Sequence, residues 1–64
     1  MNLVTGEIVE IRKDTWMNIA RVRINGVTIQ VPLQFVPQAK VGDHVLIEGG
    51  VAIAVVEDEP KEKS

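Results

Sequence analysis

The sequence predicts an all-β protein, a small five-stranded OB-like barrel, and three observations support this fold class. Short runs rich in β-branched residues recur along the chain, turn residues separate them, and no long stretch has the period of a helix. Five such runs fit within the first 56 residues, which is typical of small closed or nearly closed barrels. An SH3-like barrel is the alternative architecture.

The first expected strand covers residues 3–11, LVTGEIVEI. Gly6 interrupts this run, which predicts either a bulge or the close approach of another backbone. A polar turn, residues 12–16, separates this strand from the second.

The second and third strands, residues 18–24 and 27–31, flank the strongest local signal in the sequence. Asn25-Gly26 favours a two-residue type I′ turn, because that turn needs positive φ at both positions. The turn sets a register in which one face is wholly apolar and the other wholly polar, and a one-residue slip would destroy that separation. The predicted apolar pairs are Ile24 with Val27, Val22 with Ile29 and Ala20 with Val31, and the polar pairs are Arg23 with Thr28 and Arg21 with Gln30.

The segment after Pro32 is short and bounded by prolines, so a single helical turn over residues 33–37 is expected. Its apolar residues, Leu33, Phe35 or Val36, would fill one end of the core. A loop, residues 38–43, leads to the fourth strand. We expect one domain, residues 1–56, followed by a flexible, disordered charged tail, residues 57–64.

The last two strands, residues 44–48 and 51–56, flank Gly49-Gly50. A two-residue turn there pairs Ile47 with Ala52 and Val45 with Ala54, so that these residues and Val56 form an inner face. The other face is too apolar for a simple solvated surface, which predicts a docking or dimer surface; burial of both faces by barrel curvature is the alternative. That second face carries His44, Leu46, Glu48, Val51, Ile53 and Val55.

Composition excludes several functions. The chain has no cysteine, so disulfides and thiolate metal sites are excluded. Glu48 shares a face with the only histidine, His44, but lies too far along the strand to bind a metal together with it. We find no nucleophile–base pair, P-loop or zinc spacing, so we predict no catalytic residue and no enzyme. The net charge of −2 and the two aromatic residues disfavour nucleic-acid binding, although Arg21 and Arg23 share a face. No signal peptide or membrane span is present, which predicts a soluble cytoplasmic protein.

The second half of the chain, VPLQFVPQAKVGDHVLIEGGVAIAVVEDE, resembles the HypC/HupF family of [NiFe]-hydrogenase maturation chaperones. That family shows a pattern similar to L-x-L-V-P-x-A-K-V-G-D-x-V-L-V-H-x-G-F-A-I. The most specific part of the match is residues 37–53, and the GEIVEI segment of the first strand also fits. The resemblance implies an OB-like barrel that carries an iron–cyanide–carbonyl precursor between the HypD scaffold and the hydrogenase large subunit.

The sequence departs from the family pattern at the residues that the resemblance implies are functional. Asn2 stands where the family has its metal-binding cysteine, Glu48 where it has a histidine, and Val51 where it has a phenylalanine. An amide cannot replace a thiolate towards iron, so we expect no iron cofactor.

The expected function is therefore that of an accessory protein that binds a maturation scaffold or a metalloenzyme precursor, with a homo-oligomer as a further possibility. An OB-fold nucleic-acid-binding module and a small oligomeric structural module are the alternatives. The predicted partner-binding residues are Asn2, Leu3, His44, Leu46, Glu48, Val51 and Ile53.

Overall fold

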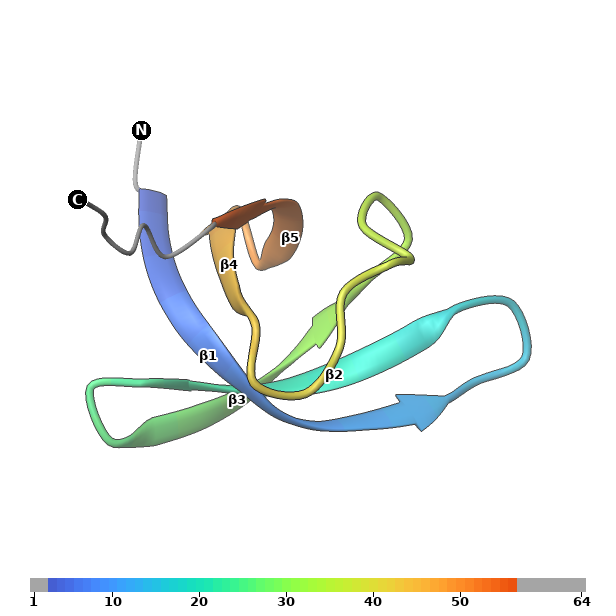
Figure 1. Ribbon diagram of the computed structural model, residues 1–64, viewed down its shortest axis with the longest axis horizontal. Helices are drawn as coiled ribbons and strands as arrows, with labels where there is room; N and C mark the ends of the chain where they lie inside the picture. Colours follow the sequence, from blue (N-terminus) through green and yellow to red (C-terminus); the bar gives the residue numbers. More distant parts are fainter. Residues whose placement is uncertain (1–2, 57–64) are drawn as a thin grey trace, which may run out of the picture.

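A computed structural model describes residues 3–56 as one antiparallel sheet with the strand order β3-β2-β1-β4-β5 (Figure 1). The predicted all-β class and the five strands are confirmed, and no helix occurs in the described residues. Asn2 and the predicted charged tail lie outside them. The strands are β1 (Leu3–Lys13), β2 (Asn18–Ile24), β3 (Val27–Pro32), β4 (His44–Glu48) and β5 (Val51–Val56).

The central strand is β1, which pairs with β4 through its first half and with β2 mainly through its second half. An irregularity between Ile8 and Glu10 marks the bend, and there the Ile8 N–H donates to the Asp43 carbonyl at 2.9 Å. Gly6 is buried where β1 crosses β2; a Cβ at this position would lie 2.7 Å from Ile24 Cγ1 and closer still to Val22 Cγ1. The predicted close approach at Gly6 is confirmed, and the bulge lies further along the strand.

The β2–β3 hairpin has the predicted register at every pair. Asn25 has φ of 53° and Gly26 has φ of 83°, as a type I′ turn requires. The apolar face of this hairpin enters the core at Ala20, Val22 and Val31, which are fully buried. Local turn chemistry and side-chain alternation therefore specify the same structure here.

The β4–β5 hairpin follows the prediction only near its turn. Ile47 pairs with Ala52 as expected, but a bulge then leaves Ile53 without an opposite residue, and Val45 pairs with Val55 rather than Ala54. The predicted inner positions of Ala54 and Val56 are thus wrong. The extra residue in the bulge moves each later side chain of β5 to the other face of the sheet. Val55, predicted on the outer face, packs against the core instead.

The sheet is not closed into a barrel, because β3 and β5 form its two edges in the described chain and no ladder joins them. The OB-like barrel is therefore not confirmed. The expected helical turn is also absent: two hydrogen-bonded turns take its place, with the Val36 N–H bonded to Leu33 and the Ala39 N–H bonded to Val36. These turns bury Leu33 and Val36 but leave Phe35 61% exposed.

One apolar core lies inside the curved sheet and is completed by the segment between β3 and β4. No buried residue in the described part of the chain is polar or charged. The core consists of Ile8, Ala20, Val22, Val31, Leu33, Val36, Ala39, Val45, Ile47 and Ala52.

Candidate functional site

The start of β1 and the tip of the β4–β5 hairpin lie side by side. Leu3 is the cross-strand partner of Glu48, and Glu48 is in turn the partner of Val51. Directly opposed residues share a face of the sheet, so these three side chains form one row across three strands. The structure thus brings together residues that are separated by most of the chain.

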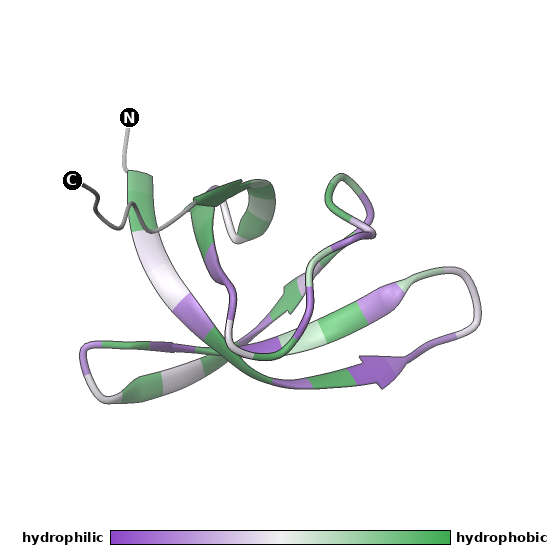
Figure 2. Ribbon diagram, in the orientation of Figure 1, coloured by the Kyte–Doolittle hydropathy of each residue, from purple (hydrophilic) through white to green (hydrophobic). Residues whose placement is uncertain are grey.

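A second row extends the same face, with Leu46 between Thr5 and Ala54. The bulge residue Ile53 adjoins this row. We call Leu3, Leu46, Glu48, Val51 and Ile53 the hairpin-end surface. Figure 2 shows hydrophobic residues at the start of β1 and along β5, which with β4 form this surface.

The hairpin-end surface is accessible and largely apolar. Leu3 is 46% exposed and Ile53 42% exposed, while Leu46 and Val51 are half-buried. Glu48 is exposed and supplies the one charge. An aliphatic surface with a single carboxylate at its centre is suited to contact with another protein, because burying the aliphatic groups is favourable and the carboxylate gives a directional contact.

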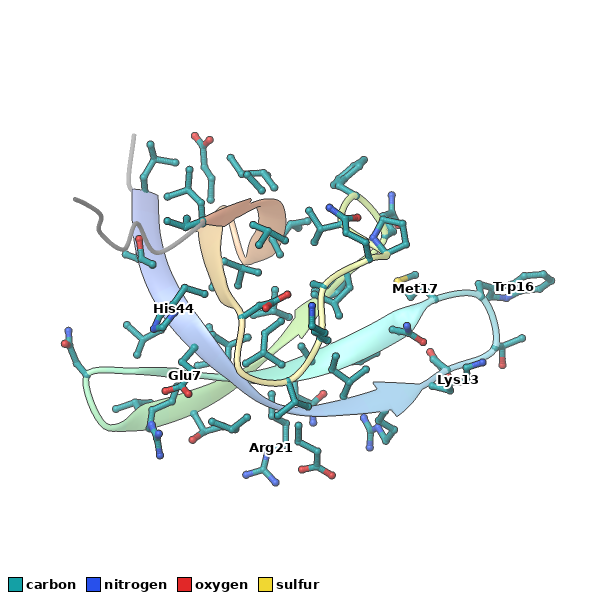
Figure 3. The ribbon with its side chains drawn as sticks, viewed as in Figure 1. Glu7, Lys13, Trp16, Met17, Arg21 and His44 are labelled. Atoms are coloured by element: carbon teal, nitrogen blue, oxygen red, sulfur yellow. The ribbon has the colours of Figure 1, made fainter. Side chains whose placement is uncertain are left out.

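His44 lies at the other end of β4 from this surface. Its cross-strand partners are Glu7 and Val56, and Figure 3 shows Glu7 and His44 on the neighbouring strands β1 and β4. No group of three or more potential metal ligands occurs in residues 3–56. His44 nevertheless shares its face of β4 with Leu46 and Glu48, because side chains two residues apart on a strand point to the same side, and it lies at the far end of that face from the hairpin tip. Asn2 lies outside the described residues.

The polar face of the β1–β2 pair carries the two arginines noted in the sequence. Arg21 is bonded to Glu10 at 3.3 Å and Arg23 to Glu7 at 3.4 Å. Both pairs are largely exposed, so each contributes little to stability. Each carboxylate offsets the charge of its arginine, which disfavours binding of Arg21 and Arg23 to a phosphate backbone, although the exposed Arg12 lies beside Glu10 and Arg21.

Sequence reasoning missed the exposure of both aromatic residues. Trp16 is 87% exposed and, in Figure 3, points away from the sheet at the turn between β1 and β2. Composition gives the number of aromatic residues but not their place, so only the polar neighbours of Trp16 could have indicated this. The adjoining hollow is lined by Trp16, Met17, Asn18, Leu33, Gln34 and Pro37.

Within residues 3–56 there is no helix that is long and apolar enough to cross a membrane.

Comparison with known proteins gives two matches. The model of the HupF/HypC family matches residues 4–64. A protein named hydrogenase maturation factor HypC, from Synechocystis sp., is 30% identical over 61 residues, which cover 92% of this chain and 80% of that protein.

Proposed function

The chain belongs to the HupF/HypC family, and from this premise we propose that it is an accessory protein in the maturation of a hydrogenase-type metalloenzyme. It acts in the cytoplasm by binding another protein, either a maturation scaffold or the enzyme precursor, and it catalyses no reaction itself. The observation that carries the proposal is the family match over almost the whole chain, together with the name of the relative from Synechocystis.

The contact is made by the hairpin-end surface. Its row of Leu3, Glu48 and Val51 joins the start of the chain to the last hairpin, which are the two regions that the family resemblance implies are functional. Leu3 and Ile53 are both more than 40% exposed, so a partner that covers them gains apolar burial without rearranging the core.

This chain binds its partner without carrying iron. The full sequence has no cysteine, and a thiolate is the side chain whose softness suits low-spin iron. Glu48 offers a hard carboxylate at the position where the resemblance implies a histidine. The role is thus one of recognition or placement, and delivery of the metal precursor belongs to another protein.

The direct test is affinity capture of the tagged, full-length chain from its native host, with mass spectrometry and metal analysis of the eluate. Recovery of a maturation scaffold or a hydrogenase-type precursor is expected. Recovery of the chain alone, or of ribosomal material, would contradict the proposed function. Iron that stays with the purified chain in equal amount would contradict the claim that it carries none.

The surface is tested by a matched pair of variants, Val51→Asp and Val41→Asp. Both replace a valine by a carboxylate, but Val51 lies in the hairpin-end surface, whereas Val41 is 58% exposed in the loop at the other end of β4. We expect Val51→Asp to lose the partner and Val41→Asp to retain it. Circular dichroism checks the fold, and Ile53→Asp serves if Val51→Asp unfolds. Equal capture by all variants would refute this surface.

A further inference from the structure

The strand β3 is an open edge of the sheet without the usual protection. Natural edge strands carry charges, internal prolines or bulges that prevent pairing with another chain. The register of β3 with β2 is regular throughout, its proline is its last residue, and residues 24–32 include no charged side chain. The other edge, β5, is interrupted by the bulge at Ile53.

The direction of the free backbone groups follows from one hydrogen bond. The Leu33 N–H donates to the Asn18 carbonyl at 3.0 Å, so the backbone N–H of residue 33 faces β2. In an antiparallel pair the residues alternate between bonding the neighbour and facing away. The backbone groups of Val27, Ile29 and Val31 therefore form hydrogen bonds with β2. The N–H and C=O groups of Thr28 and Gln30 face away from β2.

Pro32 also falls in an outward position and supplies a carbonyl but no N–H. The side chains on the core side of this edge extend beyond the core, since Val27 is 61% and Ile29 37% exposed. The edge thus presents two residues, Thr28 and Gln30, whose N–H and C=O groups both face outward, and a short aliphatic strip.

We propose that this edge pairs with β3 of a second copy of the chain, antiparallel and about a two-fold axis. Thr28 then lies opposite Gln30 of the second copy, and the reverse, which forms four backbone hydrogen bonds. Ile29 faces Ile29 of the second copy at the axis, where opposed side chains approach most closely.

The backbone selects this register. Pairing Gln30 with its own copy would place Thr28 opposite Pro32, which has no N–H to give. Pairing Thr28 with its own copy would place Gln30 opposite Gly26, which belongs to the turn. No like charges come together in this dimer, because residues 24–32 carry no charged side chain. Pairing about a two-fold axis uses the β3 edge of both copies, so it gives a closed dimer and not a fibre.

This inference does not depend on the proposed function. The hairpin-end surface belongs to β1, β4 and β5, whereas the new contact is made by the backbone of Thr28 and Gln30 in β3, at the other end of the strand order (Figure 1). The curvature of the sheet also brings β3 into contact with β5. A dimer through β3 would use none of the residues of the hairpin-end surface.

The test combines sedimentation equilibrium with amide hydrogen exchange on the full chain. From micromolar to millimolar concentration, we expect the mass to rise from 7.1 kDa towards twice that value. Amide exchange at Thr28 and Gln30 should become slower as the protein concentration rises, because only the monomer exposes these amides. When the dimer is about ten times more abundant than the monomer, the exchange rate should be about tenfold lower. Val27 and Ile29 stay protected throughout. A mass of 7.1 kDa at all concentrations, or no concentration dependence at Thr28 and Gln30, would overturn the proposal.

Three variants locate the contact. Ile29→Lys places like charges together at the axis, and Thr28→Pro removes an outward donor. Val56→Lys is the control, since Val56 has the same 37% exposure on the other edge. The first two should remain monomeric while Val56→Lys dimerises as the unmodified chain does. A dimer that survives both changes in β3, or one lost only in Val56→Lys, refutes pairing through β3. The exchange measurement decides the matter should a variant unfold.

Discussion

Replacing Gly6 by alanine tests how the candidate site is held in place. Gly6 lies where β1 leaves β2 and turns towards β4, so its lack of a side chain allows the start of β1 to reach the last hairpin. Its φ is not in the left-handed region, so only space forbids alanine here. The added methyl group would meet Val22 Cγ1, lie 2.7 Å from Ile24 Cγ1 and lie 3.1 Å from the Arg23 carbonyl oxygen.

The expected cost follows from these contacts. Val22 is fully buried and the Arg23 oxygen is backbone, so neither can simply turn away. Overpacking of this kind lowers the free energy of unfolding by about 1–3 kcal/mol. The lower entropy of the unfolded chain with alanine offsets about 0.4–1 kcal/mol of that loss. The net loss is about 1–2 kcal/mol, which lowers the melting temperature of so small a domain by roughly 5–15 °C.

Urea denaturation of a double-mutant cycle isolates the cause. Val22→Ala removes the methyl group that the new side chain meets, so Gly6→Ala combined with Val22→Ala should be less destabilising than the sum of the two by about 1 kcal/mol. Gly6→Ala that is neutral or stabilising would refute the crossing of β1 over β2 as described. Strict additivity would show that Val22 is not the obstacle.

Three further predictions concern the turn and the surface. Asn25→Ala should cost about 1 kcal/mol in urea denaturation, since φ of 53° is a left-handed conformation that asparagine tolerates better than alanine, whereas Asn25→Gly should leave stability nearly unchanged. Trp16→Ala should change the unfolding free energy by less than about 0.5 kcal/mol, because the side chain is 87% exposed, and Trp16 fluorescence should shift little on unfolding. Arg21→Ala should cost less than about 1 kcal/mol, because its ion pair with Glu10 is more than half exposed; a larger loss would contradict that exposure.

The hairpin of β2 and β3 could be predicted in full because two independent signals agree. Asn25-Gly26 selects the turn, and alternating side chains select the same register. In β5 every residue is apolar, so alternation gives no information and the bulge at Ile53 leaves no trace in the sequence. The facing of Val55 and Val56 could not be predicted for that reason.

Closure of the sheet and burial of the connecting loop depend on contacts between distant segments. No turn links β3 to β5, so nothing local decides whether they pair. In the loop, Leu33 and Val36 are spaced to enter the core from successive turns, which leaves Phe35 outside. The row of Leu3, Glu48 and Val51 combines a local hairpin with a long-range pairing of β1 and β4. Only the hairpin half of that row follows from the turn at Gly49-Gly50.

The central claim, that the hairpin-end surface binds a maturation partner, is tested most directly by an NMR titration of the isotope-labelled chain with the protein captured from the host. We expect the amide signals of Leu3, Leu46, Glu48, Val51 and Ile53 to shift or broaden on addition of the partner, and those of Trp16 and Phe35, which lie outside that surface, to stay unchanged. Changes centred on Trp16 and Phe35, with the β4–β5 hairpin unaffected, would contradict the account.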